Sequence, residues 1–374
     1  MKRLLRSPTL RSPLLWTFIA SLVLLLAVGG WLLTDPATSR SEALKTGGIA
    51  GGAIVALYAL WLNDRRRRVE ERRQEIERQR QELELRRADQ DRDRISDERF
   101  AKAVELLGHD ADQVRVGAMH ALAGLARGRA VYRQTVLDIL CSYLRRPFEH
   151  PRYDETAKPS RGDSEKKATP EQDQELQVRQ TAQRLIGELL PAADSADVPA
   201  YDLDLTGAVL EYFDLSERKV GKLLLRYAGL YSSTNLSGCV FRGPVYLTGA
   251  GAGEKKRIGF FRCSEAKFEQ RAWFSGVRFS EDAEFRGTAF AGETSFKDSV
   301  FVKNAVFADA KFGKTLDLHR ARFESFADLS FGEPPGTVSL YNTMVEPSRD
   351  HELPAGWSVE TLPDGRARLV MKDR

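Results

Sequence analysis

Apolar residues gather in two long segments at the start of the chain. Residues 14–33 contain no charged side chain over 20 positions, and at about 1.5 Å per residue this length matches a bilayer core of roughly 30 Å. Residues 47–63 form a second, shorter segment that is rich in glycine. The pattern predicts two transmembrane helices at these positions, joined by an external loop at residues 34–46.

Basic residues set the expected orientation of this hairpin. Residues 1–13 carry four Lys or Arg and Arg65–Arg68 follow the second segment, whereas the loop holds only Arg40 and Lys45. The positive-inside rule then places both termini and the soluble domains in the cytoplasm, as a two-span protein of the cell membrane with the lipid bilayer as a partner. A cleaved signal peptide is the rival interpretation, but the first segment is too long for its apolar core.

Charged residues dominate the next stretch, 64–95, which contains no Gly or Pro. Arg and Glu recur four positions apart, an arrangement that supports a single exposed helix. Val69, Ile76 and Leu83 fill only half of a heptad seam, so we expect a stalk with weak coiled-coil pairing. The glycine pairs 47/51 and 48/52 form overlapping GxxxG patterns, a second route to a weak homo-oligomer.

Helical periodicity continues after Ser96, which we interpret as an N-cap. Residues 96–146 and 171–191 carry helical apolar stripes, and the polar, proline-bearing residues 147–170 between them read as a linker. Val114 and Val178 each begin a V-R-x-x-A-x-x-x-L pattern. Such paired helices resemble HEAT-type repeats, which stack into binding surfaces.

A different period governs the chain from residue 201. Large apolar residues recur every five positions and then in alternating steps of six and five, and a small residue stands two positions before most of them. The second half of this series is Phe268, Phe274, Phe279, Phe285, Phe290, Phe296, Phe301, Phe307, Phe312, Leu318, Phe323 and Leu329. The period fits neither a helix nor a strand, and it predicts a solenoid whose axis is packed with these residues.

The A-x-F-x-x pattern resembles pentapeptide repeats. This resemblance implies a right-handed quadrilateral β-helix over residues 201–331, with four repeats and about 22 residues in each coil. Residues 247–257 break the register and should loop out. With the helical segment ahead of it, the chain resembles bacterial membrane-anchored pentapeptide repeat-containing proteins.

The tail at residues 332–374 has the pattern of a hairpin around Pro363-Asp364-Gly365 and is expected to cap the solenoid. The complete fold prediction is an α+β multidomain membrane protein. It combines a two-helix transmembrane hairpin, a charged helical stalk, a HEAT-like α-helical domain and a right-handed quadrilateral β-helix, the pentapeptide-repeat solenoid.

Little in the sequence indicates chemistry. His109 and His120 are isolated, and Cys141, Cys239 and Cys263 have no spacing typical of a zinc site. The loop Gly249–Gly253 fits neither phosphate-binding motif. The sequence therefore predicts no catalytic, cofactor-binding or metal-ligating residue and no cofactor.

Charge and composition complete the functional expectation. The 57 basic and 53 acidic residues leave a net charge of +4, which excludes a nucleic-acid polycation and contrasts with the acidic, DNA-imitating proteins that protect gyrase. We expect a membrane-tethered, non-enzymatic scaffold for an unidentified protein partner, with no nucleic acid and no small-molecule substrate. A DNA-mimic or topoisomerase-binding module, or an unrecognised enzyme, is the alternative.

Overall fold

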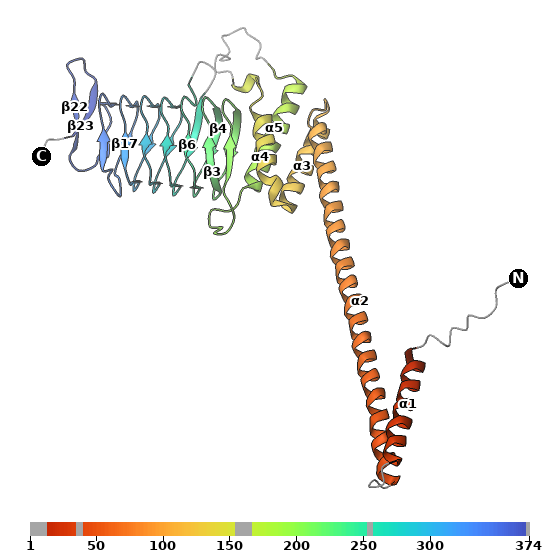
Figure 1. The fold of residues 1–374 in the computed structure, drawn as a ribbon. Coiled ribbons are helices and arrows are strands. Elements are labelled where there is room, and N and C mark those ends of the chain that lie inside the picture. The colour runs from red at the N-terminus through yellow and green to blue at the C-terminus, as the bar shows by residue number, and fades with distance from the viewer. Residues whose placement is uncertain (1–12, 35–39, 154–166, 253–256, 372–374) are drawn as a thin grey trace. The chain divides into compact units, whose positions relative to one another are not determined.

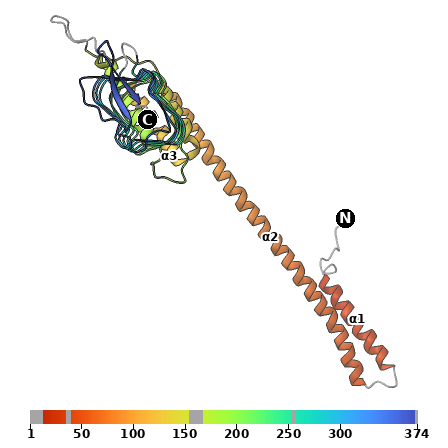
Figure 2. The same ribbon diagram turned by 90° about the vertical axis from the view of Figure 1, so that its left-hand side faces the viewer.

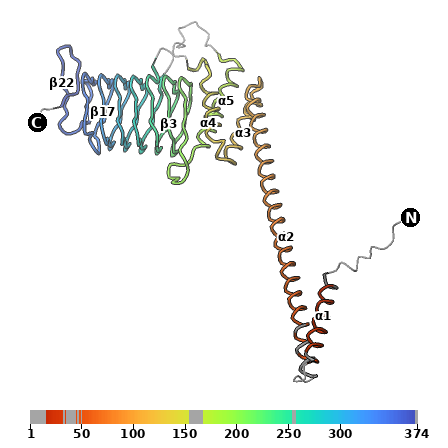
Figure 3. The backbone as a smooth tube through the Cα atoms, viewed as in Figure 1, coloured from red at the N-terminus to blue at the C-terminus, as the bar shows by residue number. Residues whose placement is uncertain are grey.

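The computed structural model describes residues 13–34, 40–153, 167–252 and 257–371. The chain divides into two compact units, residues 1–95 and 96–374, which are considered separately. Figures 1 and 3 trace the elements in chain order. The N-terminal residues 1–12, most of the loop expected at 34–46 and most of the linker expected at 147–170 lie outside the described residues.

The first unit consists of helix α1 (Pro13–Leu33) and most of helix α2 (Arg40–Leu106). The hydroxyl of Ser21 donates a hydrogen bond to the carbonyl of Gly51 over 2.6 Å. A Cβ at Gly51 would lie 3.2 Å from that hydroxyl oxygen, whereas Gly48 and Gly52 have no such neighbour within 4 Å. Of these glycines, Gly51 is therefore the one against which α1 packs.

The predicted transmembrane hairpin is wrong. Across residues 13–34, 40–153, 167–252 and 257–371, no helix is long and apolar enough to cross a membrane. The second apolar segment is not a helix of its own but part of α2, a helix of 67 residues that is mostly charged. The two-span membrane localisation falls with the hairpin.

Helix α2 also passes through Ser96 without interruption, so Ser96 is not an N-cap. The charged segment and the first apolar stripe of the helical region form one continuous helix. Its last turns bury Ala103, and Leu107 just beyond its end is buried as well.

The helical part of the second unit covers the first coil of the solenoid. Helices α3 (Asp112–Gly128), α4 (Arg133–Leu144) and α5 (Pro170–Leu189) follow α2, with short 3-10 turns η2 (Ala130–Tyr132) and η3 (Pro151–Tyr153). Thr169 caps α5 in a reciprocal pair of hydrogen bonds with Gln172. The buried residues of these helices and of the solenoid belong to one apolar core, so the helices close the N-terminal end of the β-structure.

The rest of the second unit is a parallel β-solenoid (Figure 1). Its strands are β1 (Tyr201–Asp204), β2 (Val209–Asp214), β3 (Lys219–Leu224), β4 (Gly229–Asn235), β5 (Val240–Phe241), β6 (Val245–Tyr246), β7 (Ile258–Arg262), β8 (Lys267–Phe268), β9 (Ala272–Trp273), β10 (Arg278–Phe279), β11 (Ala283–Glu284), β12 (Ala289–Phe290), β13 (Thr294–Ser295), β14 (Val300–Phe301), β15 (Ala305–Val306), β16 (Lys311–Phe312), β17 (Thr315–Asp317), β18 (Arg322–Phe323), β19 (Ala327–Asp328), β20 (Thr337–Ser339) and β21 (Met344–Val345).

The strands stack into four faces, and Figure 2 shows the coils superposed in an end-on view. Phe268 pairs with Phe290 and Phe290 with Phe312, a step of 22 residues on one face. Phe279 pairs with Phe301 and Phe301 with Phe323 at the same step on another. The quadrilateral β-helix predicted for residues 201–331 is therefore confirmed, including its coil length.

The core follows the predicted repeat. Phe296 is fully buried, and its ring stacks on Phe274 with centroids 4.7 Å apart and planes 7° from parallel. Phe301 stacks on Phe323 at 4.8 Å in the same way. Such ladders add to the burial of each ring.

Polar residues in the small inward positions satisfy themselves against the coil below. The hydroxyl of Thr288 donates to the carbonyl of Cys263 over 2.7 Å, and that of Ser299 to the carbonyl of Phe274 over 2.6 Å. Because a buried hydroxyl without a partner is unfavourable, these bonds explain why Thr and Ser can replace Ala at this position.

A hairpin covers the C-terminal end of the solenoid. Strands β22 (Trp357–Thr361) and β23 (Ala367–Met371) are antiparallel, and β23 pairs with β21 through Val345 and Ala367. Ala367 and Leu369 are buried, and the ring of Trp357 meets Phe331 edge-on at 5.8 Å. The hairpin thus covers apolar surface that the last coil would otherwise expose.

Candidate interaction surfaces

The residues with reactive side chains are used for packing. Cys141 lies in α4, and Cys239 and Cys263 point into the solenoid; all three are buried. Burial raises the pKa of the Cys141 thiol and of the Cys239 thiol to about 12 each. Thiols that stay protonated at neutral pH are poor nucleophiles and poor metal ligands. No group of three or more His, Cys, Asp or Glu that could hold a metal ion occurs in the described part of the chain.

The glycine-rich loop after Leu247 does not present free amides to a phosphate. The N–H of Gly249 donates to the carbonyl of Ser275 and the N–H of Gly251 to that of Ala228, each over 2.9 Å. A phosphate-binding loop needs such N–H groups unbound and converging. These two amides instead hold the neighbouring coils together; Lys255 and Lys256 lie outside the described residues.

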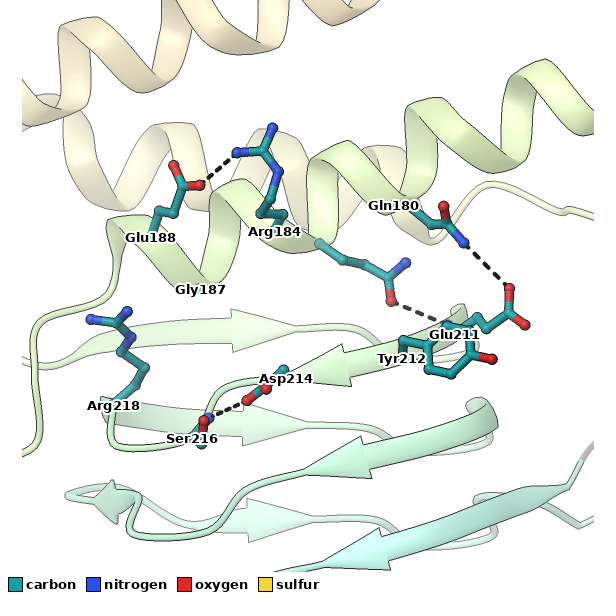
Figure 4. Close-up of a pocket in the computed structure, with 10 residues that line it drawn as sticks. Gln180, Arg184, Gly187, Glu188, Glu211, Tyr212, Asp214, Ser216 and Arg218 are labelled. Carbon is teal, nitrogen blue, oxygen red and sulfur yellow. Dashed lines mark hydrogen bonds and ion pairs between the residues drawn. The ribbon is translucent and has the colours of Figure 1, made fainter.

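A pocket of about 640 Å³ lies where α5 meets the first coils. Figure 4 shows its lining, with Gln180, Arg184 and Glu188 from the helix facing Tyr212 and Asp214 from β2. Arg184 and Glu188 form an ion pair of 2.6 Å. The main chain of α5 approaches β2 so closely at Gly187 that a Cβ there would lie 3.2 Å from the carbonyl oxygen of Asp214.

Glu211 is the buried carboxylate beside this pocket, with 2% of its side chain exposed. It accepts hydrogen bonds from the hydroxyls of Tyr153 (3.1 Å) and Ser232 (2.9 Å) and pairs with Arg152 at 3.2 Å. Burial and the neighbouring carboxylate raise the pKa of Tyr153 well above its usual value. A carboxylate surrounded in this way by donors joins the η3 segment to the solenoid and is not available as a general base.

Tyr212 is the strained residue of the pocket. It has a φ of 52° and lies at a bulge in the pairing of β2 with β4, with 62% of its surface exposed. A bulge of this kind turns a side chain out of the strand. The pocket therefore combines one exposed aromatic ring with polar groups that mostly bind one another.

The outer surface of the solenoid carries a second feature, which we name the Arg–aromatic patch: Arg226, Tyr246, Arg271 and Trp273. Tyr246 of β6 and Trp273 of β9 are paired in adjacent coils and meet edge to face at 5.4 Å. The guanidinium of Arg226 lies 4.5 Å from the ring centre of Tyr246, and that of Arg271 lies 4.7 Å from the ring centre of Trp273. Each ring is thereby held between neighbours and stays partly exposed.

Sequence periodicity gave no sign of this patch. Tyr246 and Trp273 each stand one position before a buried residue, so both face outward. Their separation is 27 residues, against 22 between later coils, because the loop after Leu247 is inserted between them. The signal that would have found them is the outward register itself, counted from Leu247 and Phe274.

These features define the class of the protein: a four-sided parallel β-solenoid, filled by its own side chains, closed by helices at one end and by a hairpin at the other. Residues 274–322 match the family model described as pentapeptide repeats (9 copies), and this is a pentapeptide-repeat protein. The coils of the structure extend beyond the matched residues on both sides, from Tyr201 to Val345. The comparisons with curated proteins and with solved structures give no match.

Proposed function

We propose that this protein is a non-enzymatic binding module that recognises another protein through the Arg–aromatic patch. The observation that carries the proposal is the pairing of two partly exposed aromatic rings with two stacked guanidinium groups on an otherwise rigid face. Trp, Tyr and Arg are the residues in which protein–protein binding energy concentrates. Side chains already held in place lose little conformational entropy on binding.

A protein partner fits this surface better than a nucleic acid does. Base stacking needs free aromatic faces, but guanidinium groups lie over the rings of Tyr246 and Trp273. Arg271 is also paired with Glu293 at 3.5 Å, and the same outward row continues with Ser295 and Asp317. The row therefore lacks the run of positive charge that follows a phosphate backbone.

DNA mimicry has less support for a related reason. A mimic of DNA presents continuous negative charge, but several acidic residues of the solenoid are paired with basic ones in the adjacent coil. Examples are Arg242 with Glu269 at 2.6 Å and Lys311 with Glu333 at 3.5 Å. The faces carry alternating charge, which favours a specific protein contact over imitation of a polyanion.

The test is affinity capture with the full chain and two single variants. Trp273→Ala removes the centre of the patch, and Tyr341→Ala removes an exposed aromatic ring that stacks on His319 outside the patch. We expect the proteins captured by the wild type to be lost with Trp273→Ala and kept with Tyr341→Ala.

Equal capture by the two variants contradicts the proposal. A labelled single-stranded oligonucleotide serves as the second probe in the same experiment. Saturable oligonucleotide binding that Trp273→Ala abolishes replaces the protein partner by a nucleic acid. Circular dichroism checks that both variants keep the β-solenoid.

A further inference from the structure

A groove of about 610 Å³ lies in the helical region, between the last turns of α2 and the outer side of α3. Both helices can be followed in Figure 1. We name it the α2–α3 groove. Its lining residues are Ser96, Arg99, Lys102, Ala103 and Leu106 from α2, and Ala121, Gly124, Leu125, Gly128 and Arg129 from α3 and the residue after it.

The floor of the groove is apolar and its rim is basic. Ala103 is buried and Leu106 and Leu125 are half-buried, so the floor consists of aliphatic side chains. Arg99, Lys102 and Arg129 stand along the rim, and no Asp or Glu belongs to the lining. An apolar base with charge of one sign around it is complementary to an amphipathic segment of the opposite charge.

Glycines in α3 strengthen this interpretation. Gly117 and Gly124 lie inside the helix and are exposed, and a Cβ at either position would meet nothing within 4 Å. Glycine inside a helix costs about 0.5–1 kcal/mol relative to alanine. Internal packing does not require this loss, since α3 buries its opposite side, through Met119, Leu122 and Ala126.

We infer that the α2–α3 groove is the docking site for an acidic amphipathic helix of another protein. Small residues on one side of the groove allow a helix axis to approach α3 at the short end of the usual 8–10 Å range. The apolar side of that helix covers Leu106 and Leu125, and its acidic residues meet the three cations of the rim. An added β-strand is a poor alternative, because the groove lies between two helices and offers no strand edge.

This groove is independent of the Arg–aromatic patch, and its test uses the full chain with a display library of helical peptides. In the library, apolar residues are fixed at heptad positions and the remaining positions are random. We expect the selected peptides to carry a net negative charge, and replacement of their acidic residues by lysine to weaken binding at least tenfold.

Two variants locate the binding. Gly124→Leu fills the groove, and Ala101→Leu adds the same bulk at an exposed position of α2 outside the lining. Gly124→Leu should weaken binding of the selected peptides at least tenfold without lowering the melting temperature, and Ala101→Leu should bind as the wild type does.

Several results overturn the inference: selected peptides without a negative bias, or equal binding to wild type and Gly124→Leu. A third is a dimer of the full chain that Gly124→Leu dissociates, because a second copy then occupies the groove. Loss of binding with Trp273→Ala as well points to the patch instead of the groove, and so separates this inference from the proposed function.

Discussion

Phe296 provides the most direct test of the solenoid register. It is fully buried, stacks on Phe274, and meets Phe285 and Phe307 edge to face, each with ring centroids 5.3 Å apart. Lys297, the next residue, is exposed. The change Phe296→Ala therefore removes a ring from the centre of a ladder, whereas Lys297→Ala removes only a surface chain.

The expected magnitude follows from these contacts. Replacement of a buried Phe by Ala costs about 3–5 kcal/mol when the surroundings cannot collapse into the space. Each aromatic pair contributes roughly 0.5–1.5 kcal/mol beyond burial, and three such pairs involve Phe296, so we expect the upper end of that range. Phe296→Leu keeps most of the volume and should cost about 1.5 kcal/mol. Lys297→Ala should cost under about 0.5 kcal/mol.

Urea unfolding followed by far-UV circular dichroism measures these differences. Native-state hydrogen exchange adds their location, because neighbouring coils of a solenoid unfold partly independently. The N–H of Phe274 donates to the carbonyl of Ser295, and the N–H of Phe296 to that of Asp317. In Phe296→Ala these amides should lose protection first. Equal midpoint shifts for Phe296→Ala and Lys297→Ala would refute the register.

Three further outcomes are expected. Gly292→Ala should destabilise the solenoid by about 1–3 kcal/mol in urea unfolding, because its Cβ would lie 2.4 Å from the main chain of Gln270; a neutral result contradicts the coil spacing. Arg179→Ala should cost about 3–5 kcal/mol by the same measurement, since the buried guanidinium serves the carbonyls of the α4 end and stacks on a phenylalanine; a loss under about 1 kcal/mol contradicts this role. An Ellman titration at pH 8 should detect no fast-reacting thiol in the native protein and all three after denaturation, because burial raises the pKa of Cys141 and Cys239 to about 12 and that of Cys263 well above its usual value, so the thiolate is absent at that pH; rapid reaction of the native protein contradicts it.

Inward positions were the part of the fold that the sequence predicted well. Each coil must place a large residue and a small one on the same axis, so packing repeats the choice in every turn. Phe268, Phe290 and Phe312 illustrate this, with rings stacked at 4.9 and 5.1 Å. A constraint that recurs at a fixed interval leaves a periodic signal, and the period gave the coil length.

Local signals failed where a longer element overrode them. Ser96 has the side chain of an N-cap, but a cap contributes only about 1 kcal/mol. The residues on both sides of it are strong helix formers, so extending α2 is favourable and the helix continues. The second apolar segment was misread for a similar reason, since composition alone did not reveal that it is part of a 67-residue helix.

Outward positions could not be predicted from periodicity at all. Solvent imposes no size or shape on Tyr246 or Trp273, so neither belongs to a repeating series. The buried pair of Glu211 with Arg152 was equally invisible, because the two residues are 59 positions apart and meet only after η3 folds onto β2. The candidate surfaces of a solenoid therefore have to be read from the coil register, once the interior has fixed it.

The alternation of five and six residues also specifies the corners of the solenoid. In each five-residue step from Cys263 to Phe323, the residue two positions after the buried one has a positive φ of 55–65°: Glu265, Gly276, Gly287, Asp298, Asp309 and Arg320. None of the six-residue steps between Phe268 and Leu329 contains such a residue. A left-handed residue turns the chain sharply, so that corner needs one residue fewer. Left-handed backbone costs a residue with a side chain roughly 1–2 kcal/mol, and the packed ring ladders on both sides of each corner offset that strain. The spacing of the phenylalanines in the sequence thus determines the backbone conformation of corners whose own residues share no common type.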